Sequence, residues 1–224
     1  MLKPKRKLTR REMKEDKLVT FWFQAIDFIQ AHMREIAIGV IAVAVVIGVS
    51  AWHSHQQGQN EESASVVLAK ARSAYDSQQL DLAIKYFGEV VNSYENTTSA
   101  ELAMIMLANA FMQKAEYQTA EEYYRKFLDN HGSDPVLSAA AAAGVAATYD
   151  ERGEYLKAGE LYEQAARKYA KSYRAPELLM RAARCFRLVD NSEATLRVIN
   201  LLLEKYPKSD VIEDAKLVKA EMQS

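Results

Sequence analysis

Residues that could carry out chemistry are few in this chain of 224 residues, and none stand at a catalytic spacing. The chain lacks the GxSxG, HExxH, P-loop and CxxC motifs. Its single cysteine, Cys185, lies among apolar residues and predicts a buried structural thiol. His53 and His55 are two positions apart, so on a helix they point to different faces and predict no metal site. We therefore expect no cofactor, no metal and no enzyme activity, short of a composite site that no motif reveals.

The remaining polar patterns have simpler explanations than catalysis. The neighbouring acids Glu121-Glu122 and Asp150-Glu151 diverge on a helix, which predicts solvated charges rather than an acid–base pair. Asn96-Thr97-Thr98 matches a glycosylation acceptor, a three-residue pattern that often arises by chance. With catalytic motifs absent from the sequence, binding is the activity that we expect.

The longest apolar run, Ile36–Trp52, predicts a membrane-spanning helix around which the chain is organised. It is 17 residues long and carries no charge. At about 1.5 Å per residue it spans roughly 25 Å, close to the thickness of a bilayer core. A buried helix of a soluble protein would have more polar positions than Ser50 alone. Val49-Ser50-Ala51 resembles a signal-peptide cleavage site, but the 35 residues before the run are too many for a signal's charged region, which favours an uncleaved anchor.

The distribution of charge predicts the orientation of this anchor. Residues 1–35 contain nine Lys or Arg and five Asp or Glu, whereas no Lys or Arg follows the run until Lys70. Because basic residues near a spanning helix stay on the cytoplasmic side, we expect the N-terminus inside and residues 53–224 outside. In a bacterium, this describes a single-pass inner-membrane protein with its C-terminal domain in the periplasm.

The cytoplasmic segment, residues 1–35, is expected to contain an amphipathic interfacial helix. Met1–Lys14 is basic and polar, which predicts a disordered stretch or one lying on lipid headgroups. Glu15–Met33 gathers large apolar side chains such as Trp22 and Phe28 on one side. Such a helix either leads into the anchor along the interface or contacts a membrane-embedded partner. No interleaving of aromatic and basic residues indicates nucleic-acid binding.

The exported portion contains internal repeats. Residues 53–63 are polar and predict a linker or a frayed continuation of the spanning helix. Beyond them, a series with spacings of 37, 38 and 37 residues consists of Tyr94, His131, Tyr169 and Tyr206. A second series, with spacings of 37, 38 and 36, consists of Ala83, Ala120, Ala158 and Ala194. Two registers with one period predict about four repeats within residues 64–224, with His131 replacing a tyrosine in packing.

The sequence pattern of each repeat predicts two helices joined by a tight turn. Small residues recur where the paired helices must approach, in the second helices at the alanines just named and in the first helices at Ala71, Ala108, Ala146 and Ala182. Gly153 supplies the left-handed conformation that ends a first helix. Gln78 and Ala115 replace this glycine in two other repeats, from which we expect an irregular pitch but no loss of the fold.

The third repeat carries a family resemblance. The run Gly153-Glu154-Tyr155-Leu156-Lys157-Ala158, together with Tyr162, resembles the tetratricopeptide repeat. Ile212–Met222, with a polar outer face, is the expected capping helix. The predicted fold is all-α: one transmembrane helix followed by a tetratricopeptide-like α-α superhelix of about four helical hairpins plus a C-terminal capping helix.

This resemblance implies that the first helices of the hairpins line a concave groove that binds protein. Mapped by register, the groove would be lined by Arg72, Tyr75, Ile105, Asn109, Met112, Gln113, Ala143, Ala147, Asp150, Phe186 and Arg187. This lining is apolar in the middle and charged at the ends, which suits an extended or helical peptide. Ala139–Ala143 either leaves room for a bulky guest or allows tight helix packing. Met104, Met106 and Met112 serve an adaptable surface or fill the core.

The layout of a short cytoplasmic N-terminus, one span and an exported repeat domain resembles the ancillary subunit family of the SecYEG translocon. That resemblance implies protein partners among translocon subunits, periplasmic chaperones and exported polypeptides, and a role in holding or handing over emerging proteins. The loop Tyr206–Ser209 resembles loops of envelope-assembly and cell-division proteins, so a structural scaffold is the alternative. We expect lipid contact through the single anchor and no nucleic-acid partner, and homo-oligomers are compatible with either interpretation.

Overall fold

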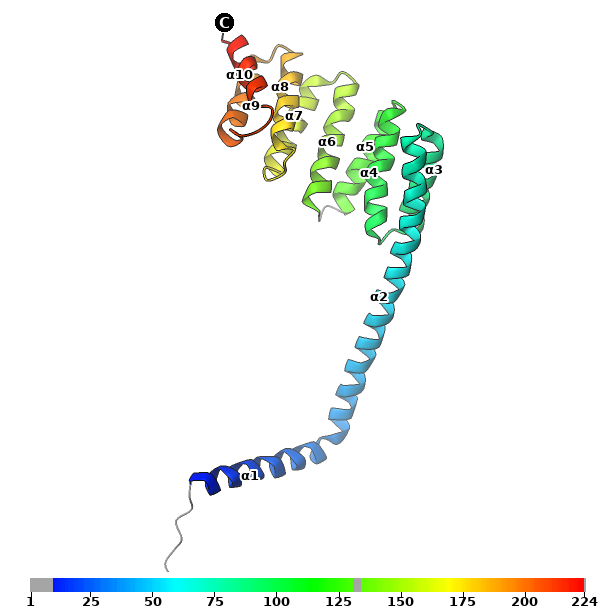
Figure 1. The fold of residues 1–224 in the computed structure, drawn as a ribbon, viewed down its shortest axis with the longest axis vertical. Coiled ribbons are helices and arrows are strands. Elements are labelled where there is room, and N and C mark those ends of the chain that lie inside the picture. The colour runs from blue at the N-terminus through cyan, green and yellow to red at the C-terminus, as the bar shows by residue number, and fades with distance from the viewer. Residues whose placement is uncertain (1–9, 131–133, 224) are drawn as a thin grey trace, which may run out of the picture. The chain divides into compact units, whose positions relative to one another are not determined.

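The computed structural model describes residues 10–130 and 134–223, which form helices joined by turns (Figure 1). They belong to two compact units, Met1–Gln56 and Gln57–Ser224. Of the basic stretch Met1–Lys14, residues 1–9 lie outside the described residues and residues 10–14 belong to the first helix. His131 also lies outside them, so its predicted role in packing remains a prediction.

The first unit contains α1 (Arg10–Ala31) and the N-terminal part of α2 (Met33–Asp76), separated at His32. Large apolar side chains of α1 face solvent, among them Phe21, Trp22 and Phe28, each more than 60% exposed. Of the described helices, α2 is the one long and apolar enough to cross a membrane, with a mean hydropathy of 2.2 over its most apolar window and none of that window buried. A signal sequence near the N-terminus passes the same test of length and composition.

The apolar run and the first hairpin share the single helix α2, which is 44 residues long. Residues 53–63 lie inside it and are helical, so the chain continues from the apolar run without an irregular linker. The physical reason is that this stretch contains no proline and a single glycine, Gly58, which costs only about 1 kcal/mol in a helix.

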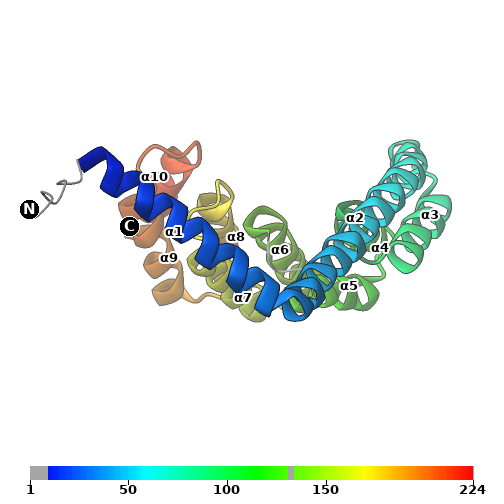
Figure 2. The same cartoon turned by 90° about the horizontal axis from the view of Figure 1, so that it is seen from below.

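The second unit is a series of antiparallel helix pairs. The part of α2 from Gln57 packs against α3 (Leu80–Ser93), with Tyr75 of α2 in edge contact with the Phe87 ring of α3. Three further pairs follow: α4 (Thr98–Gln113) with α5 (Tyr117–Asn130), α6 (Pro135–Glu151) with α7 (Tyr155–Lys168), and α8 (Ala175–Arg187) with α9 (Ser192–Lys205). The last helix, α10 (Ile212–Glu221), packs against α9. Figure 2 shows the pairs following one another in chain order. The prediction of four hairpins plus a capping helix is confirmed.

Each hairpin turns through a residue with a left-handed backbone. The φ angle is 78° at Gly153, and it is 59° at Gln78, 59° at Ala115 and 54° at Asp190. At all four turns the amide of the next residue donates to a carbonyl near the end of the first helix, as in Glu154 N to Tyr149 O at 2.9 Å and Glu116 N to Phe111 O at 2.9 Å. The turn geometry is therefore kept where the sequence lacks glycine, at a cost of about 1–2 kcal/mol for each such residue.

The helices of each pair approach closely at the predicted alanines. Ala71, Ala108, Ala146 and Ala182 are fully buried, and the second-helix series from Ala83 to Ala194 is at most 3% exposed. Large side chains fill the neighbouring space, and two glycines make room for them. Gly144 lies under the ring of Tyr124, and a Cβ at Gly159 would come within 2.8 Å of the Phe186 ring. This interlocking of small and large residues is how neighbouring repeats bury their apolar surface in an array without one central core.

Candidate functional site

The predicted groove residues lie on the first helices, whose exposed surface from α2, α4, α6 and α8 we call the first-helix face. Two of them do not reach this surface, because Ile105 is 6% exposed and Phe186 is 1% exposed. Phe186 packs over Gly159 of α7 instead of facing a partner. Both side chains belong to the hydrophobic core, so they are removed from the proposed binding surface.

The other nine predicted residues are accessible to different degrees. The exposed ones are Arg72, Gln113 and Arg187, and the half-buried ones are Tyr75, Asn109, Met112, Ala143, Ala147 and Asp150. In Ala139–Ala143 two side chains, Ala139 and Ala141, are buried and the other three are half-buried, so this stretch serves helix packing and also reaches the surface. Met104 is buried, whereas Met106 and Met112 are half-buried against the core.

Hydrogen bonds and ion pairs connect successive first helices, and α8 with α10, across this face. Gln113 Nε2 donates to the Tyr75 hydroxyl at 2.6 Å, which joins α4 to α2. Arg184 of α8 pairs with Asp150 of α6, and Arg187 pairs with Glu221 of α10 at 3.1 Å. Asp150, Arg184 and Arg187 therefore already have partners, and a ligand would have to compete for them.

Two buried tyrosines of the second helices lie beneath this face, and the sequence analysis assigned neither to the site, although Tyr162 belongs to the repeat motif. The Tyr124 hydroxyl of α5 donates to Asn109 Oδ1, and burial raises the pKa of Tyr124 above its usual range. The Tyr162 hydroxyl of α7 is buried without a hydrogen-bond partner among the described residues. Burial, and to a lesser extent the nearby Asp150 carboxylate, raises the pKa of Tyr162 to about 12. The recurrence of aromatic residues four positions after the buried alanines was the signal that could have identified them.

Cys185 is fully buried in the same part of the hydrophobic core as Tyr162, which confirms the predicted structural thiol. Burial, followed by the Asp150 charge, raises the pKa of Cys185 to about 11. The thiolate is the nucleophilic form of cysteine, so this thiol is unsuited to catalysis near neutral pH. Within residues 10–130 and 134–223, no three His, Cys, Asp or Glu side chains gather closely enough to hold a metal ion.

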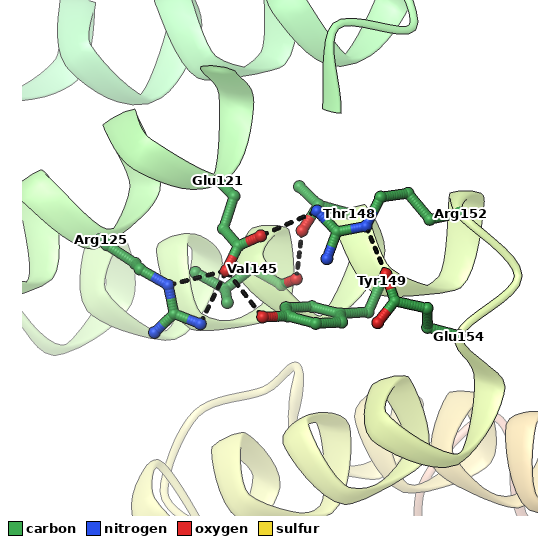
Figure 3. A network of polar contacts seen from close by, with 7 residues as sticks. All are labelled: Glu121, Arg125, Val145, Thr148, Tyr149, Arg152 and Glu154. Atoms are coloured by element: carbon green, nitrogen blue, oxygen red, sulfur yellow. Dashed lines mark hydrogen bonds and ion pairs between the residues drawn. The ribbon is translucent and has the colours of Figure 1, made fainter. Parts of the chain in front are cut away.

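A polar network joins the second and third hairpins (Figure 3). The Glu121 carboxylate accepts hydrogen bonds from Arg125 Nε, from the Tyr149 hydroxyl and from Arg152 Nη1, each at 2.9 Å. Arg152 also donates to Glu154 at 2.7 Å, so the network extends from α5 through α6 to the turn before α7. Burial alone would raise the pKa of Glu121, but the donors from Arg125, Arg152 and Tyr149 outweigh it and the pKa is lowered.

The prediction that the neighbouring acids are solvated is wrong for one member of each pair. The side chains of Glu121 and Asp150 are 15% and 10% exposed, and each pairs with an arginine of the following hairpin. Glu122 and Glu151 face solvent. Adjacent residues diverge on a helix as expected, but the sequence did not indicate that a cation from the next hairpin would meet one of them.

Two further carboxylates hold neighbouring helices together. Glu61 of α2 accepts hydrogen bonds from the amides of Thr98 and Ser99 at 2.7 and 3.0 Å, and so caps the N-terminus of α4. Glu163 of α7 pairs at 2.8 Å with Arg167 of its own helix and with Arg197 of α9. These contacts have a structural role, because their oxygen atoms are occupied by groups of the chain itself.

Two adjoining cavities open where the second helices meet the loop after α7, and we call them together the Tyr169 cleft. The inner cavity, of about 150 Å³, lies between α5, α6 and α7, and its apolar lining consists of Leu128, Ala142, Val145, Leu161 and Ala165. The outer cavity, of about 390 Å³, lies between Pro135-Val136 and residues 168–172. Lys168 and Tyr169 line both cavities. The sequence analysis did not find this cleft, because no single repeat contains it.

Residues 27–177 match the profile of the tetratricopeptide repeat-like domain family, which is more than half of the chain. The chain belongs to this family. The matched range begins within α1 and includes the apolar run Ile36–Trp52. No curated protein sequence matches the chain significantly.

Solved structures show the same fold at low sequence identity. A tetratricopeptide repeat protein from Parabacteroides merdae aligns with a TM-score of 0.57 at 17% identity, over 72% of this chain and 60% of that one. The apo form of RapI aligns with a TM-score of 0.59 at 18% identity, over 71% of this chain and 61% of RapI. TPR-like repeats from Podosopora anserina align with a TM-score of 0.52 at 15% identity, over 71% and 92% of the two chains. The aligned region thus spans about 60% of the length of the first two proteins, and the likeness concerns the fold.

Proposed function

We propose that this protein is anchored once in the bacterial inner membrane by α2 and presents its repeat array to protein partners in the periplasm. The tetratricopeptide repeat-like fold is that of a protein–protein interaction module. The observation that carries the membrane part of the proposal is the continuity of α2, which joins an exposed apolar run directly to the first hairpin. The basic residues before the run and their absence up to Lys70 support an N-terminus on the cytoplasmic side.

In this proposal, α1 lies in the cytoplasmic interface of the membrane. Its exposed Phe21, Trp22, Ile26 and Phe28 occupy an apolar arc, whereas Gln24, Asp27 and Gln30 follow each other at three-residue spacing on the opposite side. An amphipathic helix with an aromatic face buries that face at the boundary between headgroups and acyl chains. Lipid contact would therefore extend from the span into α1.

The partners that fit this arrangement are polypeptides emerging from or waiting at the membrane. The first-helix face combines half-buried apolar residues such as Met112 and Ala147 with exposed polar ones such as Gln113 and Arg72. Such a mixed surface suits an extended or helical segment, whose side chains it contacts at intervals. We propose translocon subunits, periplasmic chaperones or exported chains as the partners, and transfer of emerging proteins as the role.

Site-specific photo-crosslinking tests this proposal in intact cells. A photoreactive residue at Gln113 or at Arg72 is expected to capture translocon subunits, chaperones or exported chains. The exposed positions Lys85 and Glu89 of α3 are matched controls that are expected to capture none of them. Crosslinks to cell-division or envelope-assembly proteins alone would instead support the scaffold alternative, and equal capture from both sets of positions would contradict a role for the first-helix face.

A further inference from the structure

The Tyr169 cleft has a size and a lining that suit one apolar side chain. Its inner cavity measures about 150 Å³, and an apolar cavity of roughly this volume accepts a benzene-sized group. Val136, at the mouth of the outer cavity, is 51% exposed although it is apolar. An exposed apolar residue beside an unfilled apolar cavity indicates a surface that a partner could cover.

The charged side chains that line the cleft are of one sign. The residues lining the two cavities include Arg125, Lys168 and Lys171 and no acidic residue. The Arg125 guanidinium is neutralised by Glu121 at 2.8 Å. Neither Lys168 nor Lys171 pairs with an acidic side chain in the part of the chain that the structure describes, and the Lys168 ammonium lies 5.3 Å from the centre of the Tyr169 ring.

Three carboxylates of α5, α7 and the loop before α6 are already held by groups of the chain. Glu163 is held by Arg167 and Arg197, and Glu121 by Arg125 and Arg152. Asp134 caps α6 by accepting hydrogen bonds from the amides of Val136 and Leu137 at 2.7 and 3.3 Å. Because the linings contain no acidic side chain, Lys168 and Lys171 leave a positive potential at the cleft, which a carboxylate of a partner would complement.

We propose that the Tyr169 cleft binds a polypeptide segment in which a phenylalanine- or leucine-sized side chain is flanked by carboxylates. The apolar side chain enters the cavity under Leu161 and Val145, and the carboxylates meet Lys168 and Lys171. The proposal rests on the proposed function as a protein-binding module and adds a second surface to it, away from the first-helix face. This surface would select acidic segments with one large apolar anchor.

Fluorescence anisotropy on the full chain in lipid nanodiscs tests the proposal with three labelled peptides. The probe is a short Gly/Ser peptide with a central Asp-Phe-Asp, and its matched partners carry Lys in place of Asp or Ala in place of Phe. The first peptide is expected to bind at least tenfold more tightly than either partner. Equal affinities, or no binding up to about 1 mM, would overturn the proposal.

Three variants locate the binding. Ala142→Leu fills the inner cavity, Lys168→Glu reverses the charge at its mouth, and each is expected to weaken binding at least tenfold. Lys205→Glu is the control, because Lys205 ends α9 and precedes Tyr206 as Lys168 ends α7 and precedes Tyr169. It is expected to change the affinity less than twofold. Should Ala142→Leu fail to fold, Lys168→Glu against Lys205→Glu still decides the outcome.

Decanoate distinguishes a polypeptide from a lipid acyl chain, because it also joins a carboxylate to an apolar group. Tighter binding of decanoate than of the Asp-Phe-Asp peptide, with the same dependence on Ala142 and Lys168, would overturn the proposal in favour of a lipid site. The crosslinks expected from Gln113 and Arg72 do not depend on the cleft. Failure of the peptide experiment with those crosslinks intact would therefore leave the proposed function standing.

Discussion

Exchanges of alanine and glycine at two equivalent turns should have stability effects of opposite sign. Ala115 and Gly153 occupy the same position of successive hairpins, with φ angles of 59° and 78°. At Gly153 an added Cβ would meet no atom within 4 Å, so Gly153→Ala changes the backbone preference and not the packing. The pair therefore isolates the cost of a left-handed backbone at a residue with a side chain.

The expected magnitude combines two opposing terms. A left-handed conformation costs a non-glycine residue about 1–2 kcal/mol, whereas glycine loses about 0.5–1 kcal/mol more chain entropy on folding than alanine does. Ala115→Gly should therefore raise the free energy of unfolding by about 0.5–1 kcal/mol, and Gly153→Ala should lower it by a similar amount. In a unit of this size, 1 kcal/mol corresponds to a shift in Tm of about 2–4 °C.

Urea and thermal unfolding of Gln57–Ser224, which is a compact unit, would measure both changes by far-ultraviolet circular dichroism. Destabilisation by Ala115→Gly, or no change with Gly153→Ala, would refute the left-handed turn as the shared element of the hairpins. A change in the slope of the urea transition would indicate that the repeats unfold separately. In that case the stability of the wild type and of each variant has to be compared for the single hairpin that carries the substitution, α4–α5 for Ala115 and α6–α7 for Gly153.

Three further predictions concern the interior and the polar network. Glu121→Gln should lower the free energy of unfolding by about 1–3 kcal/mol, because Arg125 and Arg152 lose a half-buried carboxylate, whereas Glu122→Gln at an exposed position should be neutral. Arg125, Arg152 and Tyr149 lower the pKa of Glu121 in the folded state. The contribution of the Glu121 carboxylate to the free energy of unfolding is therefore fully present above the unfolded pKa of about 4.3 and is lost as the pH falls below that value towards the folded pKa. Acid should thus destabilise the wild type more than the Gln variant. Gly159→Ala should destabilise by about 1–3 kcal/mol through overlap with the Phe186 ring, while Gly88→Ala, with no atom within 4 Å, should stabilise by about 0.5–1 kcal/mol. Cys185 should resist a thiol alkylating reagent in the folded protein and react after unfolding, and rapid labelling without unfolding would contradict its burial.

The hairpin array could be predicted because the spacing of small residues in its repeats follows directly from helix packing. The alanines from Ala71 to Ala194 recur at the repeat period because only small side chains fit where paired helices touch. The turns at Gln78 and Ala115 departed from the glycine pattern, yet they have the same backbone as Gly153, since the hydrogen bonds that end each helix outweigh the local cost.

The candidate surface was predicted less completely, because register gives a backbone position but not the depth of a side chain. Ala143 and Ile105 occupy equivalent positions, but the short alanine is half-buried at the surface while the isoleucine fills the core. Phe186 turns inward because Gly159 leaves space for its ring. The available signal for this packing was Gly159 itself, because a glycine in the interior of a predicted helix, away from any turn, indicates that a neighbouring group needs the space of its missing side chain.

Contacts between repeats could not be derived from the pattern within one repeat. The ion pair between Asp150 and Arg184 and the hydrogen bonds that Glu121 accepts from Tyr149 and Arg152 join residues 28 to 34 positions apart. The Tyr169 cleft likewise needs three helices and a loop to enclose it. Such features depend on the pitch at which hairpins stack, and that pitch follows from the packing of side chains along the whole array.

The most direct test of a membrane-anchored array on the far side of the membrane is a topology assay in bacterial cells. An alkaline phosphatase fused after Ser224 is active only outside the cytoplasm, and a fluorescent protein fused before Met1 reports on the opposite end. The account predicts an active phosphatase and a fluorescent N-terminal fusion, both recovered in the membrane fraction. An inactive phosphatase after Ser224, or its release into the soluble fraction, would contradict the account.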